Sequence, residues 1–233
     1  MAGHSKWATI KRQKGANDAK RGAIFTKIGN QIAVAARHGT DPEMNPSLAM
    51  VIEKARAANM PNANIQRAID RVKDKNAAQL EEITYEAYGP GGVGMIIETT
   101  TDNRNRTLPE VKTTLAKNGG RIADEGSVVF QFERKGIIRV KGTGEELLLT
   151  ILDAEVEDAS EENGEIIVYT DPKKLQSVRK DLKNASCEIQ DAGMEYVAKN
   201  TVELDSEAEQ KLTKLLDALD DLDDVNNVSH NAA

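Results

Sequence analysis

The spacing of apolar residues predicts a long helix near the start of the chain. Between residues 17 and 39, apolar residues recur at intervals of three to four positions: Ile24, Phe25, Ile28, Ile32 and Ala36. This period is typical of a helix that buries one face. Gly39 follows the last apolar position and predicts the end of the helix.

Two shorter helices are predicted next. The segment 48–59 is expected to be helical, with Ser47 as its N-cap. After the tight turn "MPNAN", the segment 63–75 places its apolar residues inward and turns Arg67 and Arg71 outward. Two helices joined by so short a turn also resemble a helix-turn-helix, in which these arginines face a DNA groove.

Beyond residue 80 the pattern changes to strands. Runs rich in β-branched and aromatic residues at 83–89 and 94–102 flank the glycine-rich loop "PGGVG". A helix is expected over 107–120, ending at two glycines. The segment "SVVFQFE" at 127–133 is predicted to be a further strand.

The same alternation recurs to the end of the chain. Strands are expected at 136–142 and 195–204, and a hairpin at 155–170 that turns at "ENGE". Helices are expected at 144–154, 172–185 and 206–224, before a last strand at 225–231.

This order of elements predicts an α+β multidomain protein. A three-helix N-terminal domain at 1–79 precedes two ferredoxin-like α/β domains. Because 80–133 alone lacks a covering helix and a fourth strand, we predict a discontinuous middle domain of 80–133 plus 205–233. The segment 134–204 is then an inserted domain. The alternative is two domains in simple sequence order.

Charge is divided unevenly along the chain. The protein has 233 residues and a formal net charge of -7. Residues 1–75 hold 14 Lys and Arg against 6 Asp and Glu, whereas the remainder has a net charge of -15. This asymmetry predicts a module that binds a polyanion. The alternative is that basic and acidic domains attract one another.

The densest basic cluster surrounds the only tryptophan. Its cations can neutralise phosphates, while Trp7 either stacks on an exposed base or anchors the arm to its own domain. The predicted contacts in this cluster are Lys6, Trp7, Lys11, Arg12, Lys14, Lys20, Arg21 and Lys27.

A second candidate contact is "TDNRNRT" at 101–107, where a strand meets a helix. Free N–H groups at the helix start, together with Arg104 and Arg106, can bind a backbone phosphate. The alternative is that Asp102 or Asn105 caps the helix and the arginines are solvated.

No pattern predicts catalysis. The glycine-rich "YGPGGVG" lacks the Gly-Lys-Ser/Thr ending of a phosphate-binding P-loop and precedes a strand. The three histidines and Cys187 lack the spacing of metal ligands. We therefore expect no catalytic residue, no metal and no cofactor. The sequence has a single cysteine and shows neither a secretory leader nor a long apolar run. These features predict a cytoplasmic protein that does not associate with a membrane.

Long motifs identify a family resemblance. "AGHSKWATIKRQKGANDAKRGAIFTKI", "YEAYGPGGVGMIIETTTDNRNRT", "EGSVVFQF" and "VNNVSHN" resemble the YebC family, which includes the mitochondrial translational activator of cytochrome c oxidase. The resemblance covers essentially the whole chain. It implies three domains, the middle one discontinuous, and a non-enzymatic role in gene expression.

The function predicted from these observations is a ribosome-associated translation factor. It would bind rRNA through the basic N-terminal domain and relieve stalling on difficult stretches such as prolines, as the resemblance implies. The alternative is a DNA-binding transcriptional regulator. We expect a monomer or weak dimer.

Overall fold

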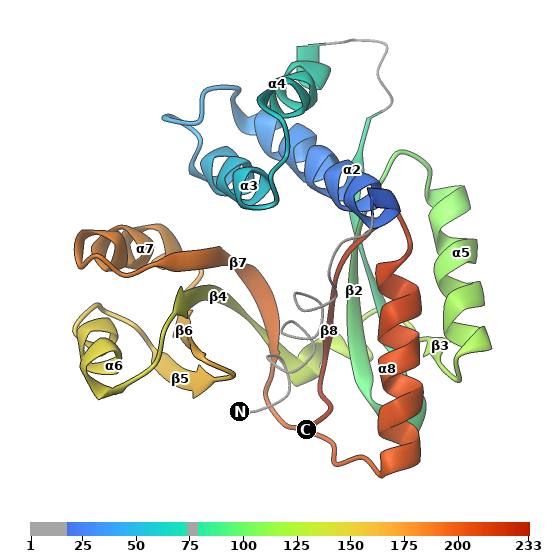
Figure 1. Cartoon of the computed structure of the whole chain (residues 1–233). Helices are drawn as coiled ribbons and strands as arrows, with labels where there is room; N and C mark the ends of the chain where they lie inside the picture. Colours follow the sequence, from blue (N-terminus) through green and yellow to red (C-terminus); the bar gives the residue numbers. More distant parts are fainter. Residues whose placement is uncertain (1–17, 74–78) are drawn as a thin grey trace. The chain divides into compact units, whose positions relative to one another are not determined.

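The computed structural model describes residues 18–73 and 79–233, which divide into two compact units (Figure 1). The larger unit contains the described residues up to Gln131 and the segment Ala198–Ala233. The smaller unit contains Phe132–Val197. No helix in these described ranges has the length and hydropathy needed to cross a bilayer.

Helices form the first part of the larger unit. They are α2 (Asp18–Ala35), η1 (Ala36–His38), α3 (Pro46–Ala57), α4 (Asn62–Asp70) and η2 (Arg71–Lys73). The predicted apolar face of α2 is buried at Ile28 and Ile32, which pack with Leu48, Ile52 and Ile65 of the next two helices. The prediction is wrong for Ile24, which is 41% exposed. Gly39 follows η1 with a φ of 137°, as its predicted role at the helix end requires.

The predicted N-cap of α3 is wrong by two residues. Asn45 is the N-cap, because its side-chain oxygen accepts a hydrogen bond from the Leu48 N–H at 3.1 Å. Pro46 occupies the first helical turn, where its missing N–H costs nothing. Ser47 lies inside the helix and is exposed.

The larger unit also contains a four-stranded sheet of order β3-β1-β2-β8. The strands are β1 (Glu81–Tyr88), β2 (Gly94–Thr101), β3 (Arg121–Ile122) and β8 (Val225–His230). Its helices are η3 (Pro90–Gly92), α5 (Arg104–Lys117), η4 (Val129–Gln131) and α8 (Ser206–Asp220). Leu115 of α5 and Leu215 of α8 are fully buried. The pairing of Ile97 with Val228 joins segments far apart in the sequence.

The strand predicted at 127–133 is wrong over its first five residues. Residues Val129–Gln131 form η4, and a strand begins only at Phe132. The cause is the buried carboxylate of Glu86, which accepts hydrogen bonds from the N–H groups of Gly126 (2.5 Å), Val128 (2.5 Å) and Val129 (2.7 Å). These N–H groups are therefore not available for a sheet.

The smaller unit has a sheet of order β5-β6-β4-β7. Its elements are β4 (Phe132–Lys141), α6 (Glu145–Leu152), β5 (Asp158–Glu162), β6 (Glu165–Thr170), α7 (Leu175–Asn184) and β7 (Ile189–Ala198). The predicted turn of the β5–β6 hairpin is confirmed, since Asn163 and Gly164 have φ values of 51° and 86°. The strand expected at 195–204 is displaced, because β7 ends at Ala198.

The predicted α+β class is confirmed by these helices and two four-stranded sheets. The predicted domain limits of 1–79, 80–133 plus 205–233, and 134–204 remain a prediction.

Candidate nucleic-acid interface

The candidate basic arm is only partly covered by the described residues. Lys6, Trp7, Lys11, Arg12 and Lys14 lie outside them. Lys20 and Arg21 lie in the first turns of α2, which begins at Asp18.

Lys27 is engaged within the protein. Its ammonium donates to the backbone oxygen of Asp220 and lies 3.4 Å from that residue's carboxylate. The residue is only 9% exposed. Because Asp220 is the last residue of α8, Lys27 places a positive charge at the negative end of that helix. Lys27 is therefore barely accessible to a phosphate.

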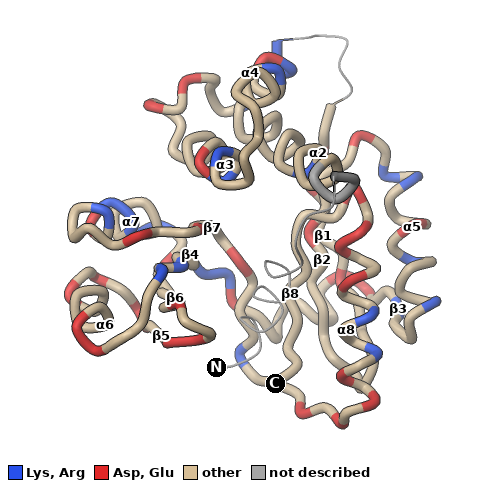
Figure 2. The backbone as a smooth tube through the Cα atoms, in the orientation of Figure 1, with Lys and Arg blue, Asp and Glu red and all other residues tan. Residues whose placement is uncertain are grey.

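A second set of cations lies on the neighbouring helices. Lys54 and Arg56 lie in the last turn of α3, and Arg67 lies in the last turn of α4 (Figure 2). We call these three the α3–α4 cations. All are exposed, and none has an acidic partner among the described residues. Cations also stabilise a helix at its C-terminal end, so their position serves the fold as well.

The connection between α3 and α4 is as short as the sequence predicted. Asn59 adopts a φ of 59°, and the Met60 N–H donates to the Ala55 oxygen at 2.9 Å. Of the two arginines expected to face outward, only Arg67 is exposed. Arg71 donates to the side-chain oxygen of Asn30 at 3.2 Å and is half-buried.

The "TDNRNRT" segment is capped by a residue that sequence reasoning did not choose. Asn103, and neither Asp102 nor Asn105, is the N-cap of α5, and its side-chain oxygen accepts from two backbone N–H groups. Polar residues at every position from 102 to 105 hid which one caps the helix.

Arg106 forms the centre of an ion-pair network. Its guanidinium donates to both oxygens of the Asp224 carboxylate at 3.0 and 2.8 Å, and to Asp102 at 3.2 Å. The Thr107 hydroxyl donates to the same Asp224 carboxylate at 2.6 Å. Hydrogen bonding and attraction to Asp224 raise the pKa of the Arg106 guanidinium above its ordinary value. A phosphate would have to compete with Asp224 for this arginine.

Arg104 is much less constrained. Its side chain is 67% exposed, and its nearest acidic partner is the exposed Glu81 at 3.8 Å. An exposed pair at this distance contributes little to stability, so Arg104 can exchange Glu81 for a phosphate. The two arginines of the motif therefore differ in availability.

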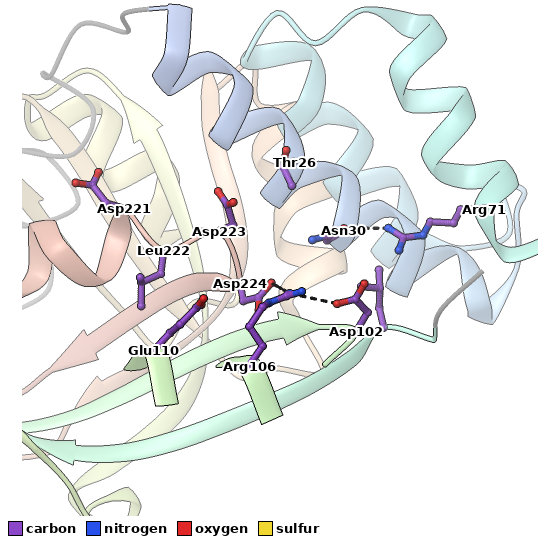
Figure 3. Close-up of a pocket in the computed structure, with 11 residues that line it drawn as sticks. Thr26, Asn30, Arg71, Asp102, Arg106, Glu110, Asp221, Leu222, Asp223 and Asp224 are labelled. Atoms are coloured by element: carbon purple, nitrogen blue, oxygen red, sulfur yellow. Dashed lines mark hydrogen bonds and ion pairs between the residues drawn. The ribbon is translucent and has the colours of Figure 1, made fainter. Parts of the chain in front are cut away.

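A cavity of about 590 Å³ adjoins this network (Figure 3). Thr26 and Asn30 of α2 line it, together with Arg71, Arg106 and the acidic turn that precedes β8. Five carboxylates line the cavity against two guanidinium groups: Asp102, Glu110, Asp221, Asp223 and Asp224. The excess of negative charge makes the cavity unsuitable for a phosphate.

The described residues contain no group of three or more His, Cys, Asp or Glu side chains arranged to hold a metal ion. Cys187 is partly buried, and burial raises the pKa of its thiol. A raised thiol pKa reduces the thiolate that reacts at neutral pH.

These features define an α+β protein that combines a basic helical region with an acidic body. Two family models match the chain. The model of the TACO1/YebC protein N-terminal domain matches residues 5–75, and that of the TACO1/YebC second and third domain matches residues 80–232. The chain therefore belongs to the TACO1/YebC family.

Relatives match over nearly their whole length. A probable transcriptional regulatory protein of Rubrobacter xylanophilus is 46% identical over 93% of this chain and 89% of its own length. Another, of Caldanaerobacter subterraneus, is 45% identical over 99% of this chain and 98% of its own length. The crystal structure of a conserved hypothetical protein from Aquifex aeolicus has a TM-score of 0.92 and 42% identity, and the match covers 98% and 97% of the two chains.

Proposed function

We propose that the chain is a nucleic-acid-binding regulator of gene expression that works by binding and without catalysis. The regulatory role is supported by the relatives, which are named probable transcriptional regulatory proteins. We further propose that its target is the ribosome, that it contacts rRNA through the helical N-terminal region, and that it relieves stalling.

The observation that carries the proposal is the difference between paired and available cations. Lys27 and Arg106 are occupied by Asp220 and Asp224, whereas the α3–α4 cations are exposed without such partners among the described residues. Exposed cations on adjacent helices can release counterions from a nucleic-acid backbone. Contacts of this kind position a protein without reading a base sequence.

The acidic part of the chain, residues 76–233, favours a target that contacts the basic residues alone. Residues 76–233 have a net charge of -15, which repels a polyanion from that part of the chain. A folded RNA surface can meet the basic region alone, which supports the ribosome as the target.

The second candidate is a DNA-binding transcriptional regulator. The short turn between α3 and α4 favours it, together with the exposure of Arg67 near the end of α4. The names of the relatives also point to transcription.

A binding experiment with matched charge variants tests the interface. The first variant replaces the three α3–α4 cations by alanine. The control replaces three exposed lysines of α5 and α8 by alanine: Lys112, Lys117 and Lys214. Both variants lose the same net charge. We expect the first variant to bind an rRNA fragment more weakly and to reduce the salt slope by about 1 per lost phosphate contact.

The outcome distinguishes an interface from overall charge. Equal weakening in both variants would mean that only net charge matters, and the α3–α4 interface would be rejected. A competition assay separates the two candidates: a promoter fragment that displaces rRNA at about 0.15 M salt would favour DNA.

A further inference from the structure

Helix α6 of the smaller unit is apolar on more than its buried face. Its sequence "EELLLTIL" contains five apolar residues, yet only Ile151 is buried. Leu149 and Leu152 are 58% and 49% exposed. A surface helix of a globular protein normally presents polar residues on its outer side. The outer side of α6 therefore departs from the usual pattern.

Leu149 and Leu152 lie three positions apart and form one small apolar patch, which we call the α6 leucine pair. Carboxylates flank it along the helix and form what we call the acidic rim. Glu145 and Glu146 lie one helical turn before Leu149, and Asp153 lies one turn after it. Figure 2 shows acidic positions in red along α6.

The surrounding carboxylates have no cationic partner among the described residues. In the same unit Glu155 pairs with Lys174 at 2.8 Å and Glu157 with Lys135 at 3.0 Å. Glu145 and Glu146 suit the positive end of α6, but Asp153 lies at its negative end, where a carboxylate is unfavourable. Helix stabilisation therefore does not account for the whole acidic rim.

The neighbouring strand does not offer an alternative way to bind a partner. β5 is at the edge of the sheet, and its sequence "DASEE" is acidic. Charged edge strands resist the addition of another strand. A partner that binds at this end of the unit is thus expected to use α6.

We propose that the α6 leucine pair and its acidic rim are a docking site for a basic amphipathic helix of a protein partner. An apolar centre with a charged rim is the usual anatomy of such an interface. The apolar side of the partner helix covers Leu149 and Leu152, and its lysines or arginines meet the rim. A nucleic acid is a poor occupant, because the rim repels phosphates.

The test uses the full-length protein and a fluorescein-labelled peptide of about 16 residues, with leucines on one helical face and lysines on the other. A scrambled peptide of equal composition controls for charge. The variant Leu149→Ala/Leu152→Ala keeps helix propensity and truncates two side chains that are about half exposed. Met194→Ala, at another exposed apolar position of the same unit, is the matched control.

We expect fluorescence anisotropy to show about tenfold weaker binding of the amphipathic peptide to the double variant. The control variant should bind like the wild type, and the scrambled peptide should bind weakly. Replacing Glu145, Glu146 and Asp153 by their amides should reduce the salt dependence.

Either of two results would overturn the proposal. One is equal binding of the amphipathic and scrambled peptides, or equal binding of the amphipathic peptide to the wild type and to the double variant. Either would indicate charge attraction alone. The other is tighter binding of a peptide with the sequence of residues 3–21, which would make the chain's own basic arm the occupant. Binding of rRNA by the double variant should be unchanged, so this test stands apart from that of the proposed function.

Discussion

At the scale of single residues, buried polar side chains determine local structure that apolar patterns do not reveal. Glu86 is 7% exposed and holds three backbone N–H groups of the loop before η4. Burial opposes its ionisation, but the hydrogen bonds to Gly126, Val129 and Val128 outweigh this and lower the pKa of the carboxyl below its ordinary value.

Glu86→Gln should destabilise the larger unit by about 2–3 kcal/mol, because an amide cannot accept all three bonds and a buried donor loses its partner. The matched control is Glu82→Gln, an exposed position on the same strand. Urea unfolding followed by circular dichroism measures the difference, and equal stability of the two variants would contradict the role of Glu86.

The same carboxylate predicts a pH dependence of stability. The pKa of Glu86 is lower in the folded state than in the unfolded state. Its contribution to the free energy of unfolding is therefore full above the unfolded pKa near 4.5. The contribution is lost as the pH falls through the folded pKa. Below about pH 5, the free energy of unfolding of the wild type should therefore fall more steeply than that of Glu86→Gln.

At the scale of elements, apolar periodicity predicted which helices and strands exist, whereas side-chain hydrogen bonds set several of their ends. Glycine turns were predictable because positive φ restricts the residue type, as at Gly91 and Gly164. The cap of α3 was not predictable, because Asn45 is favoured over Ser47 by contacts with two backbone carbonyls earlier in the chain. Its side-chain N–H₂ donates to the oxygens of Ala35 and Gly39, both at 2.8 Å.

Asn45→Ala should cost about 2–3 kcal/mol in the free energy of unfolding, since a cap and two partnered carbonyls are lost together. Ser47→Ala, at the position that the sequence favoured, should change the stability by less than about 0.5 kcal/mol. Thermal unfolding of both variants tests this. A larger loss of stability in Ser47→Ala than in Asn45→Ala would support Ser47 as the N-cap.

The start of α5 yields another paired prediction. Arg104→Ala should weaken binding of an rRNA fragment with little change in stability, because its acidic neighbour Glu81 is exposed. Arg106→Ala leaves the buried Asp224 without its guanidinium partner and should lower stability. Filter binding and urea unfolding measure the two effects. If Arg106→Ala weakened RNA binding and Arg104→Ala did not, Arg106 would be the phosphate contact.

At the scale of the whole molecule, the uneven charge was plain in the sequence, but the availability of each cation was not. Lys27 looked equivalent to its neighbours until its contact with Asp220 showed it engaged in the fold. The α3–α4 cations were overlooked as a set, because cations at helix ends are common. Only the three-dimensional pairing distinguishes a cation that holds the fold together from one that is available to a ligand.

Sedimentation through a sucrose gradient shows whether the protein binds the ribosome through the α3–α4 cations. The wild-type protein should travel with the ribosomal fractions at low salt, and the variant lacking the three α3–α4 cations should remain largely near the top. The variant that lacks Lys112, Lys117 and Lys214 should sediment like the wild type. The proposal that the protein binds the ribosome would be contradicted if the wild-type protein were absent from ribosomal fractions at low salt, both during normal translation and while translation is stalled.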